Sequence, residues 1–277
     1  MREEVELDAD FSRLWRGCDP FAEVARLEGE EFRRVKSRRT FRFELENRGY
    51  FAKIHHGVGW REIFKNLLQG KRPVLGARNE FRALKLLHRI GVDTMTPCAY
   101  GCRGGNPARL ESFLITAELR GMVSLEDFCR DWAVNPPPFR LRLGLIRRLA
   151  GMTGAMHRAG LNHRDCYLCH FLLDPRSVGE ALPRLHVIDL HRAEIRERVP
   201  FRYRVKDVAG LFFSAMDAGL NRRDLFRFMK VYRGEPLRRM LGEERRFWRA
   251  VNRAARRLYR KEHGRAALVF FKEDVDE

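Results

Sequence analysis

The sequence has no apolar run that approaches the roughly 20 residues a membrane-spanning helix needs. It also has no apolar core of a secretory signal after its charged first residues, Met1 to Glu6. We therefore expect a cytoplasmic protein whose cysteines stay reduced, so that no disulfide framework forms. The cysteines are Cys18, Cys98, Cys102, Cys129, Cys166 and Cys169.

Acidic residues are the other shortage: 37 Asp and Glu stand against 55 Lys and Arg, a formal net charge of +18 in 277 residues. The 44% hydrophobic and 33% charged residues nevertheless exclude a disordered chain and are typical of a globular protein. So large a positive charge attracts polyanions: nucleic acid, an anionic membrane surface, a phosphorylated glycolipid or an acidic protein. The charge by itself does not choose among these partners.

Short alternating segments in the first part of the chain predict β-strands. These strands are expected over residues 31–35, 40–45 and 50–54, and residues 112–119 predict a further, buried strand. A turn is expected at Asn47 to Gly49, between the second and third strands. A helix over residues 77–90, with Gly91 as its terminating residue, separates the third strand from the fourth.

The remainder of the chain is mainly helical in its pattern. Prolines 136–138 precede a helix over residues 139–159, and two short strands follow at 171–173 and 185–188. From about Val205 onward the pattern is helical. Strands first and helices last predict an α+β protein with two lobes, a small β-rich lobe over residues 1–119 and a larger α-rich lobe over residues 120–277.

The tripeptide His163-Arg164-Asp165 lies between the long helix and a short strand, and Asp189 follows the second short strand. A lone His-Arg-Asp occurs by chance, but the order helix, tripeptide, strand, loop, strand, aspartate is typical of kinases. Phosphoryl transfer from ATP needs one carboxylate that accepts the proton of the attacking hydroxyl and another that holds Mg²⁺ on the phosphates. We predict these roles for Asp165 and Asp189; the alternative is an exposed loop with ordinary solvated charges.

Lys53 lies in the third predicted strand, upstream of the helix that contains Glu80. A strand lysine often points at solvent, and a glutamate in a first helical turn often only complements the helix dipole. Glu80, however, shares a helical face with Leu84 and Leu87, which places its carboxylate near the buried side. We predict a Lys53–Glu80 pair that holds the lysine ammonium against the α- and β-phosphates of ATP.

At the level of whole segments, the sequence resembles the lipopolysaccharide core heptose(I) kinases of Gram-negative bacteria over nearly its full length. The most specific segment is residues 163–173, and the others are residues 50–55, 73–78, 156–160 and 187–193. The resemblance implies a two-lobed protein-kinase-like fold and an enzyme that uses ATP and Mg²⁺ to phosphorylate a hydroxyl of the first inner-core heptose. It also implies Asp165 as the catalytic carboxylate, Asp189 as the metal ligand, Lys53 as the phosphate-binding lysine and Glu80 as its partner.

The same resemblance implies that the protein works at the cytoplasmic face of the inner membrane, on the lipid A–heptose region of lipopolysaccharide. It is compatible with an acidic acyl carrier protein as a partner, as is the charge of +18. An anionic inner-membrane surface is a further partner that this charge favours.

The expected phosphate-binding turn departs from the general kinase pattern, because residues 36–39 contain no glycine-rich loop. We therefore expect Lys36, Arg38 and Arg39 to supply charge at the ATP phosphates in place of backbone amides. Glu118, with Leu119, is expected to form the hinge between the lobes, whose backbone meets the adenine of ATP.

Two positions near the predicted catalytic residues also differ from other kinases. His170 stands five residues after Asp165, where an asparagine is usual, and imidazole is a poorer ligand for Mg²⁺ than an amide oxygen. His170 is expected to hydrogen-bond Asp165 or a phosphate, or to bind the metal less directly. Asp189-Leu190-His191 replaces the usual Asp-Phe-Gly.

Asp207 opens a predicted helix, where it either accepts hydrogen bonds from the catalytic-loop backbone or is a plain N-terminal charge.

Other interpretations compete with a lipopolysaccharide kinase. Residues 166–170 match the C-x-x-C-H of haem attachment, which needs an export that the sequence does not indicate. A zinc site of Cys98, Cys102, Cys166 and Cys169 competes with buried thiols, the simpler explanation. A non-enzymatic nucleic-acid-binding protein would leave the Lys–Glu–Asp–Asp order unexplained, so we expect no nucleic acid. A kinase for another sugar or small-molecule hydroxyl, and a pseudokinase, are the alternatives within the fold.

The region over residues 238–265 is dense in arginine, with Phe247, Trp248 and Val251 interleaved. One interpretation is a helix with an apolar face on the core and a solvated basic face. The other is a surface for the phosphates and carboxylates of lipid A and the inner core, or for the anionic inner leaflet.

Overall fold

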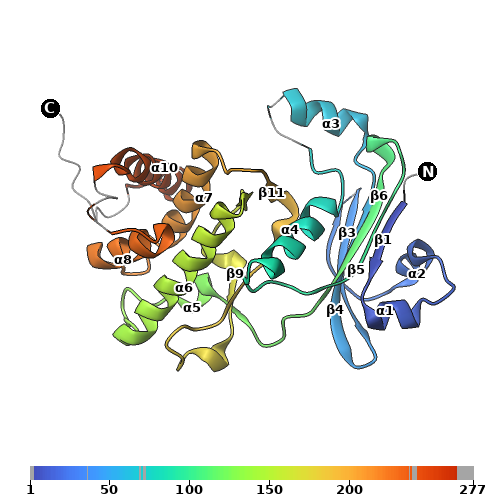
Figure 1. Ribbon diagram of the computed structural model, residues 1–277, viewed down its shortest axis with the longest axis horizontal. Coiled ribbons are helices and arrows are strands. Elements are labelled where there is room, and N and C mark those ends of the chain that lie inside the picture. The colour runs from blue at the N-terminus through green and yellow to red at the C-terminus, as the bar shows by residue number, and fades with distance from the viewer. Residues whose placement is uncertain are drawn as a thin grey trace. The chain divides into compact units, whose positions relative to one another are not determined.

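The computed structural model describes residues 3–35, 37–68, 70, 73–236, 238 and 242–266. The chain forms two compact units (Figure 1). The first contains the residues up to 86, residues 95–120 and residues 189–192, and the second contains residues 87–94, residues 121–188 and those from 193 onward. Among the helices of the described residues, none is both long enough and apolar enough to cross a bilayer.

The first unit is built on a six-stranded sheet in which every strand runs antiparallel to its neighbours. Across the sheet the strands are β1 (Glu3–Leu7), β5 (Pro97–Arg103), β6 (Glu111–Ala117), β4 (Arg48–His56), β3 (Arg38–Leu45) and β2 (Glu30–Val35). The helices are α1 (Ala9–Leu14), α2 (Pro20–Arg26), α3 (Gly59–Leu68) and most of α4 (Arg78–Arg89), with the short helix η1 (Pro107–Arg109). Figure 1 shows α1 and α2 on one face of the sheet and α4 on the other.

Alternation along β4 decides which of its side chains reach the aromatic core of this unit. Tyr50, Ala52 and Ile54 are buried in a cluster with Phe11 of α1. Because successive side chains of a strand point to opposite faces, Lys53 points to the other face, where α4 lies.

The hairpin between β3 and β4 turns at Glu46 and Asn47, which have φ values of 48° and 60°. The turn therefore lies one residue earlier than predicted, since a two-residue hairpin loop of this kind needs left-handed φ at both central residues. Gly49 instead lies in the ladder opposite Glu44. A Cβ atom at Gly49 would stand 1.8 Å from the Glu118 carboxylate, so only glycine leaves room for that side chain.

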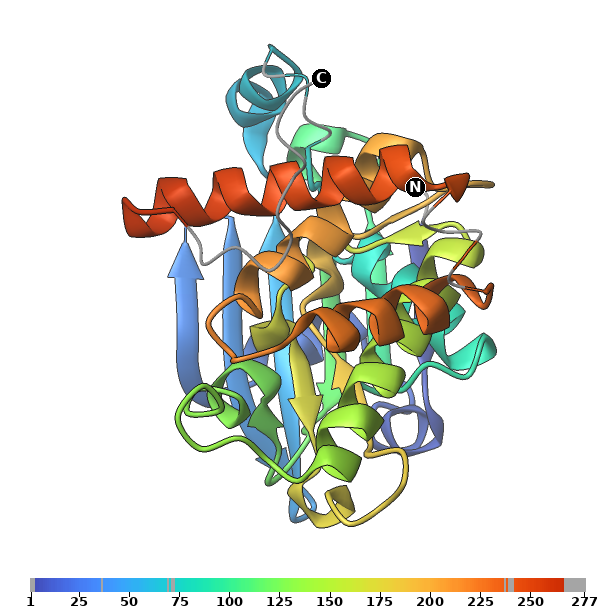
Figure 2. The same cartoon turned by 90° about the vertical axis from the view of Figure 1, so that its left-hand side faces the viewer.

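The second unit is mainly helical and contains several very short strands. Its helices are α5 (Leu125–Phe128), α6 (Phe139–Arg158), α7 (Phe201–Ser214), α8 (Arg222–Arg233) and α10 (Arg245–His263), with η2 (Leu168–His170) and η3 (Pro175–Ser177). Its strands are β7 (Val123–Ser124), β8 (Leu161–Asn162), β9 (Phe171–Leu173), β10 (Leu185–Val187) and β11 (Glu194–Ile195). α10, the long red helix of Figure 2, packs on α7, and α8 packs on α6.

α10 has the apolar face that the sequence indicates. Phe247, Val251, Ala255 and Tyr259 recur every four residues and are buried against α7, α8 and α6. The basic side chains of α10 lie on its other faces. For residues 245–263, the interpretation of a helix with an apolar face on the core is therefore confirmed.

α7 begins at Phe201, directly after Pro200, rather than near Val205 as predicted. Proline fixes an extended backbone before the first turn and cannot continue a preceding helix, which sets the start of α7 at this point. Asp207 consequently lies inside the helix, fully buried, and not in its first turn. The alternative that Asp207 is only an N-terminal helix charge is wrong.

Candidate active site

Lys53 and Glu80 are joined by an ion pair in the first unit. Lys53 Nζ of β4 lies 2.6 Å from Glu80 Oε1, at the first turn of α4. Glu80 is only 1% exposed, and a carboxylate buried to that degree needs a cation to compensate it. Its other oxygen, Oε2, is buried without a hydrogen-bond partner among the described residues. The structure thus brings together two residues that are 27 positions apart, as predicted.

The entry to α4 is fixed on strand β6 by a serine that the sequence analysis did not single out. The hydroxyl of Ser112 accepts a hydrogen bond of 3.0 Å from the backbone N–H of Ala77. A Cβ atom at Gly76 would stand 2.3 Å from the Ser112 hydroxyl oxygen, so the close approach depends on glycine. Glu80 follows Ala77 by three residues, in the first turn of α4. This hydrogen bond therefore helps to fix the position of the Glu80 carboxylate relative to the sheet.

His55, two residues after Lys53 on β4, is a buried histidine that the sequence analysis also missed. It is 5% exposed and its Nε2 atom has no partner within the described chain. Burial, and then the nearby positive charge of Arg38 and Lys53, lower the pKa of His55 to about 3. His55 is therefore neutral at physiological pH and adds no charge beside the Lys53–Glu80 pair.

Asp189 belongs to the first unit, where the short helix η4 (Leu190–Arg192) follows it. Its backbone has a φ of 58°, a conformation that non-glycine residues seldom adopt. Its carboxylate accepts a hydrogen bond of 2.6 Å from Nδ1 of His191. The histidine that replaces glycine in the usual Asp-Phe-Gly sequence thus orients this carboxylate.

The loop that contains Asp165 is held in the second unit by the buried carboxylate of Asp207. Asp207 Oδ2 accepts a hydrogen bond of 2.7 Å from the backbone N–H of His163, and Oδ1 accepts one of 2.9 Å from that of Arg164. The ring of His157 lies 3.2 Å from the same carboxylate and 2.8 Å from the hydroxyl of Tyr232. The prediction that Asp207 binds the catalytic-loop backbone is confirmed.

Further contacts fix the two residues that precede Asp165. His163 donates a hydrogen bond of 2.9 Å to the carbonyl of Ile188, the residue before Asp189. Arg164, at a φ of 75°, pairs with Glu194 at 2.9 Å. A left-handed backbone at a bulky residue costs free energy, which the surrounding hydrogen bonds offset.

His170 donates a hydrogen bond of 2.7 Å from Nδ1 to the backbone carbonyl of Asp165. Of the contacts expected for His170, the structure therefore shows one to the main chain of Asp165. The ring also stacks on that of His163 at a centroid distance of 5.7 Å. His170 thereby supports the backbone of the residue predicted to be catalytic.

Three basic residues, Lys36, Arg38 and Arg39, are expected at the ATP phosphates, and the structure describes two of them. Lys36 lies outside the described residues, while Arg38 and Arg39 lie in β3 and not in the preceding turn. Arg39 is engaged with Glu31 at 2.8 Å and lies over the ring of Phe41 at 4.2 Å. β3 begins at Arg38 because this residue pairs in the ladder with Val35 of β2 and His55 of β4.

Glu118 carries a dense set of ion pairs in the first unit. Arg42 contacts both its oxygens, at 2.7 and 3.0 Å, and Arg120 contacts one at 3.0 Å. Hydrogen bonds from Arg42 hold the pKa of this carboxyl below its usual range. The backbone N–H of Glu118 donates to the carbonyl of Gly49 at 2.9 Å. The side chain therefore orders the segment at which the hinge is predicted.

The six cysteines are not joined in disulfides, and most of them are buried. Burial raises the pKa of Cys98 and that of Cys129 to about 12, and it raises the pKa of Cys166 well above the ordinary value. Thiols in such surroundings stay protonated and are poor metal ligands. Within the described part of the chain, no three His, Cys, Asp or Glu side chains gather where they would hold a metal ion by themselves.

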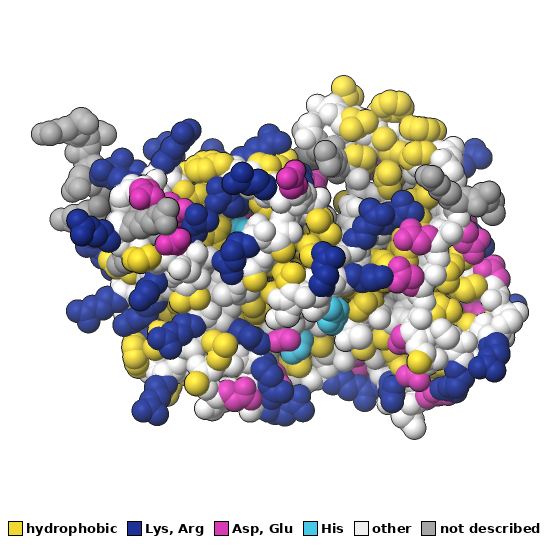
Figure 3. All heavy atoms as spheres, in the orientation of Figure 1, with side chains coloured by type: hydrophobic (Ala, Val, Ile, Leu, Met, Phe, Trp, Pro, Cys, Tyr) yellow, Lys and Arg dark blue, Asp and Glu magenta, His cyan; other side chains and the backbone are white. Residues whose placement is uncertain are grey.

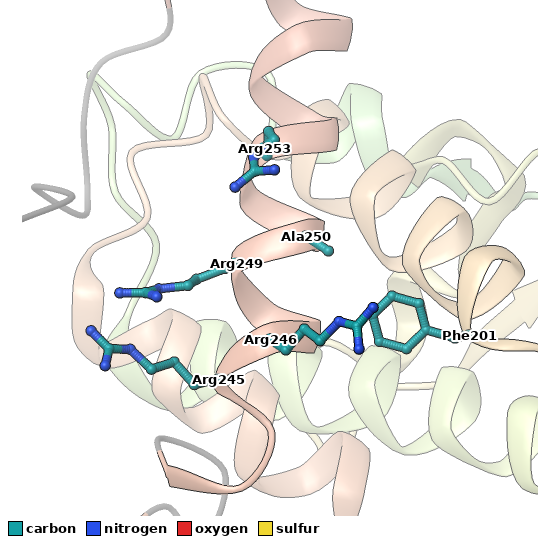
Figure 4. A pocket seen from close by; sticks show the side chains of 6 residues that line it. All are labelled: Phe201, Arg245, Arg246, Arg249, Ala250 and Arg253. Carbon is teal, nitrogen blue, oxygen red and sulfur yellow. The ribbon is translucent and has the colours of Figure 1, made fainter. Parts of the chain in front are cut away.

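A basic pocket of about 580 Å³ lies on α10 beside the start of α7 (Figure 4). Its residues are Phe201, Arg245, Arg246, Arg249, Ala250 and Arg253. Figure 4 shows Arg246 directed toward Phe201, and its guanidinium lies 5.6 Å from the ring centroid. Arginines beside an apolar surface provide bidentate donors for phosphate or carboxylate groups.

A β-sheet unit with a Lys–Glu pair and a helical unit with an aspartate-held His-Arg-Asp loop define the protein-kinase-like class, in which catalysis rests on positioning and charge. The α+β fold prediction is confirmed. Residues 22–232 match the model of the lipopolysaccharide kinase (Kdo/WaaP) family, and the chain belongs to this family. The family resemblance stated from the sequence is therefore confirmed.

Curated relatives and a solved structure agree with this assignment. The chain is 52% identical to lipopolysaccharide core heptose(I) kinase WaaP of Pseudomonas aeruginosa over 256 residues, which cover 92% of this chain and 96% of the relative. It is 51% identical to the protein of the same name from Escherichia coli K12, with the same coverage of 92% and 96%. A solved structure described as WaaP in complex with acyl carrier protein is 47% identical, with a TM-score of 0.80, and covers 94% of this chain and 100% of its own.

Proposed function

We propose that this chain is an ATP-dependent kinase that phosphorylates the first inner-core heptose of lipopolysaccharide during core biosynthesis. The observation that carries the proposal is the intact pair of polar networks, Lys53–Glu80 and Asp207 with the catalytic loop. They occur in a chain that shares 52% of its residues with an enzyme of that name over nearly its full length. A non-enzymatic nucleic-acid-binding protein has no need of either network.

Asp165 is the residue that we propose orients the sugar hydroxyl and accepts its proton. Its backbone is held by His170 at the carbonyl, and the N–H groups of the two preceding residues are held by Asp207. A carboxylate on a backbone fixed in this way keeps its geometry without reorganisation during the reaction. His170 is thus a positioning residue in place of the usual asparagine.

Lys53 is the group that we propose contacts the ATP phosphates, with Glu80 as the partner that orients it. Asp189 fits a Mg²⁺ ion, because an ionised carboxylate is a hard oxygen ligand and His191 fixes its direction. When bound, Mg²⁺ supplies charge neutralisation at the phosphates. Of Arg38 and Arg39, we propose that Arg38 adds charge there, because Arg39 is already paired with Glu31.

The location and partners that we propose follow from the same assignment. A lipid-linked acceptor places the enzyme at the cytoplasmic face of the inner membrane. An acidic acyl carrier protein is a proposed partner, because a relative with a TM-score of 0.80 is described in complex with one and the chain carries a net charge of +18. The arginine pocket on α10 is the proposed surface for the acidic groups of the acceptor.

The experiment that tests the function is transfer of labelled phosphate from Mg-ATP to lipopolysaccharide that lacks core phosphate. The wild-type protein should label the acceptor, and the near-isosteric variant Asp165→Asn should not, while its circular dichroism stays that of the wild type. Equal labelling by the two proteins would remove Asp165 from the catalytic role. A folded wild-type protein that labels a different sugar and not lipopolysaccharide would overturn the acceptor assignment.

A further inference from the structure

Helix α3 presents a row of large apolar side chains to solvent. Trp60 is 50% exposed, Phe64 57%, Leu67 53% and Leu68 89%. Figure 3 shows hydrophobic side chains gathered over this helix, at the top of the view. Single exposed apolar residues are common on soluble proteins, whereas a continuous patch of this kind marks an interaction surface.

The four residues lie on one face because they are spaced as i, i+4, i+7 and i+8. At 100° per residue they cover about 100° of the helix circumference. Ile63, at the next position around the helix, is buried, and α3 packs against η1. The helix is therefore attached to its unit along one edge, and the apolar face beside that edge is left exposed.

The basic residues of α3 lie at the border of this apolar face, and its other polar residues lie opposite the face. Arg61 and Lys65 fall next to Leu68 around the helix, and Glu62 and Asn66 fall on the far side. Lys65 contacts Glu62 at 3.8 Å, and both side chains are exposed. An amphipathic helix with aromatic and leucine side chains on one face and basic residues at its border is typical of helices that lie in the lipid–water interface.

We propose that α3 inserts its apolar face into the surface of an anionic lipid bilayer. The inference rests on the proposed function, since a lipid-linked acceptor requires the enzyme to work at a membrane. Trp60 and Phe64 stack at 5.8 Å and together form a wedge suited to the boundary between headgroups and acyl chains. Arg61 and Lys65 then reach the headgroup phosphates, in agreement with the chain's charge of +18.

The bilayer is a better occupant of this face than a protein partner. The exposed surface is that of a single convex helix, and Figures 1 and 2 both show α3 beyond the ends of the sheet strands. A protein partner for a convex helix must supply a groove, whereas lipid chains conform to the helix without one.

The test compares binding of the full chain to vesicles of phosphatidylethanolamine and phosphatidylglycerol in a sedimentation assay. The variant Phe64→Glu/Leu68→Glu should lower the partition coefficient at least tenfold. The matched control Val134→Glu/Leu182→Glu adds the same two charges at exposed apolar residues elsewhere, 82% and 43% exposed, and should stay within twofold of the wild type. Equal binding by the α3 variant and the wild type would overturn the proposal.

A second readout separates insertion from electrostatic adsorption. Lipids with brominated acyl chains should quench part of the tryptophan fluorescence, and Trp60→Phe should remove that part while binding persists. Quenching that is unchanged in Trp60→Phe would show that α3 does not enter the bilayer. Loss of affinity for an acidic carrier protein in the α3 variant, with vesicle binding retained, would equally overturn the proposal.

Kinase assays distinguish failure of this inference from failure of the proposed function. On a deacylated, water-soluble core oligosaccharide, the α3 variant should keep the wild-type rate within twofold, because α3 contains no proposed catalytic residue. On acceptor embedded in vesicles its rate should fall at least fivefold. A wild-type protein that binds vesicles through α3 but phosphorylates neither acceptor would leave the insertion standing and overturn the function.

Discussion

The two buried carboxylates of the candidate site, Glu80 in the first unit and Asp207 in the second, are satisfied in different ways. Asp207 binds two backbone N–H groups through both its oxygens, with His157 beside them. Glu80 has one cation on one oxygen, and its second oxygen has no partner within the described chain. A carboxylate whose oxygens are all used fixes a backbone, whereas one that holds a single side chain sets the position and charge of that side chain. Stability and activity should therefore respond differently when each is changed.

Removal of the Asp207 carboxylate should have the largest effect on both properties. Asp207→Ala leaves two buried N–H groups without acceptors, which should lower the free energy of unfolding by about 2–5 kcal/mol. It should also abolish phosphate transfer, because the backbone before Asp165 loses its support. Chemical denaturation and labelled-phosphate transfer measure the two effects. Asp207→Asn keeps an acceptor and should lie between the alanine variant and the wild type, and stability unchanged in Asp207→Ala would contradict this account.

Lys53 should separate the two properties. Lys53→Met leaves the Glu80 charge buried without its cation, which should cost about 3 kcal/mol of stability, at the low end for a buried pair because Lys53 is 18% exposed. It should lower turnover about 10²–10³-fold. Adding Glu80→Gln to the same chain removes the buried charge, so stability should recover while turnover stays low. Thermal unfolding and steady-state kinetics provide the two measurements. Recovery of turnover in the double variant would show that Lys53 does not act on the phosphates.

Sequence order was sufficient to locate the elements that contain the candidate site residues. The β4 strand, the α4 helix and the His-Arg-Asp loop place Lys53, Glu80 and Asp165 where the pattern predicts them, because alternation and helical periodicity decide which side chains face inward. The bonds from Asp207 to the loop join residues more than 40 positions apart and were inferred only from the kinase-like order.

Local pattern was insufficient where a distant contact decides the geometry. Arg39 was expected in a turn, but it lies in β3 and pairs with Glu31 of β2, an arrangement that depends on strand register and that a short polar segment does not reveal. The burial of His55 breaks the alternation of β4, since both Ile54 and His55 are buried. The start of α7 at Phe201 is different, because Pro200 directly before it is a local signal that the sequence-based prediction did not use.

The acid dependence of stability should be traceable in part to His55. Its pKa is lowered to about 3, so between that value and its ordinary value of 6.5 the unfolded chain binds a proton that the folded chain does not. Stability therefore rises as the pH rises through this window and is complete above it, and at pH 5 the loss from this residue should be about 2 kcal/mol. His55→Gln should therefore reduce the slope of the free energy of unfolding against pH, measured by chemical denaturation between about pH 5 and pH 7. The exposed neighbour variant His56→Gln is the control, and equal slopes in all three proteins would exclude His55 as the source.

The smallest effect should come from the arginine pocket on α10, which touches neither network. Arg249→Ala/Arg253→Ala should raise the KM for lipopolysaccharide about threefold to tenfold and leave kcat within twofold, because exposed charges bind the acceptor equally in its ground and transition states. The difference should shrink at high salt, since these side chains are solvated. Arg140→Ala/Arg147→Ala removes two exposed arginines of α6 and should leave KM near the wild-type value. A similar rise in KM for both variants would assign the effect to net charge, and a fall in kcat without a change in KM would mean that the pocket acts on the catalytic step instead.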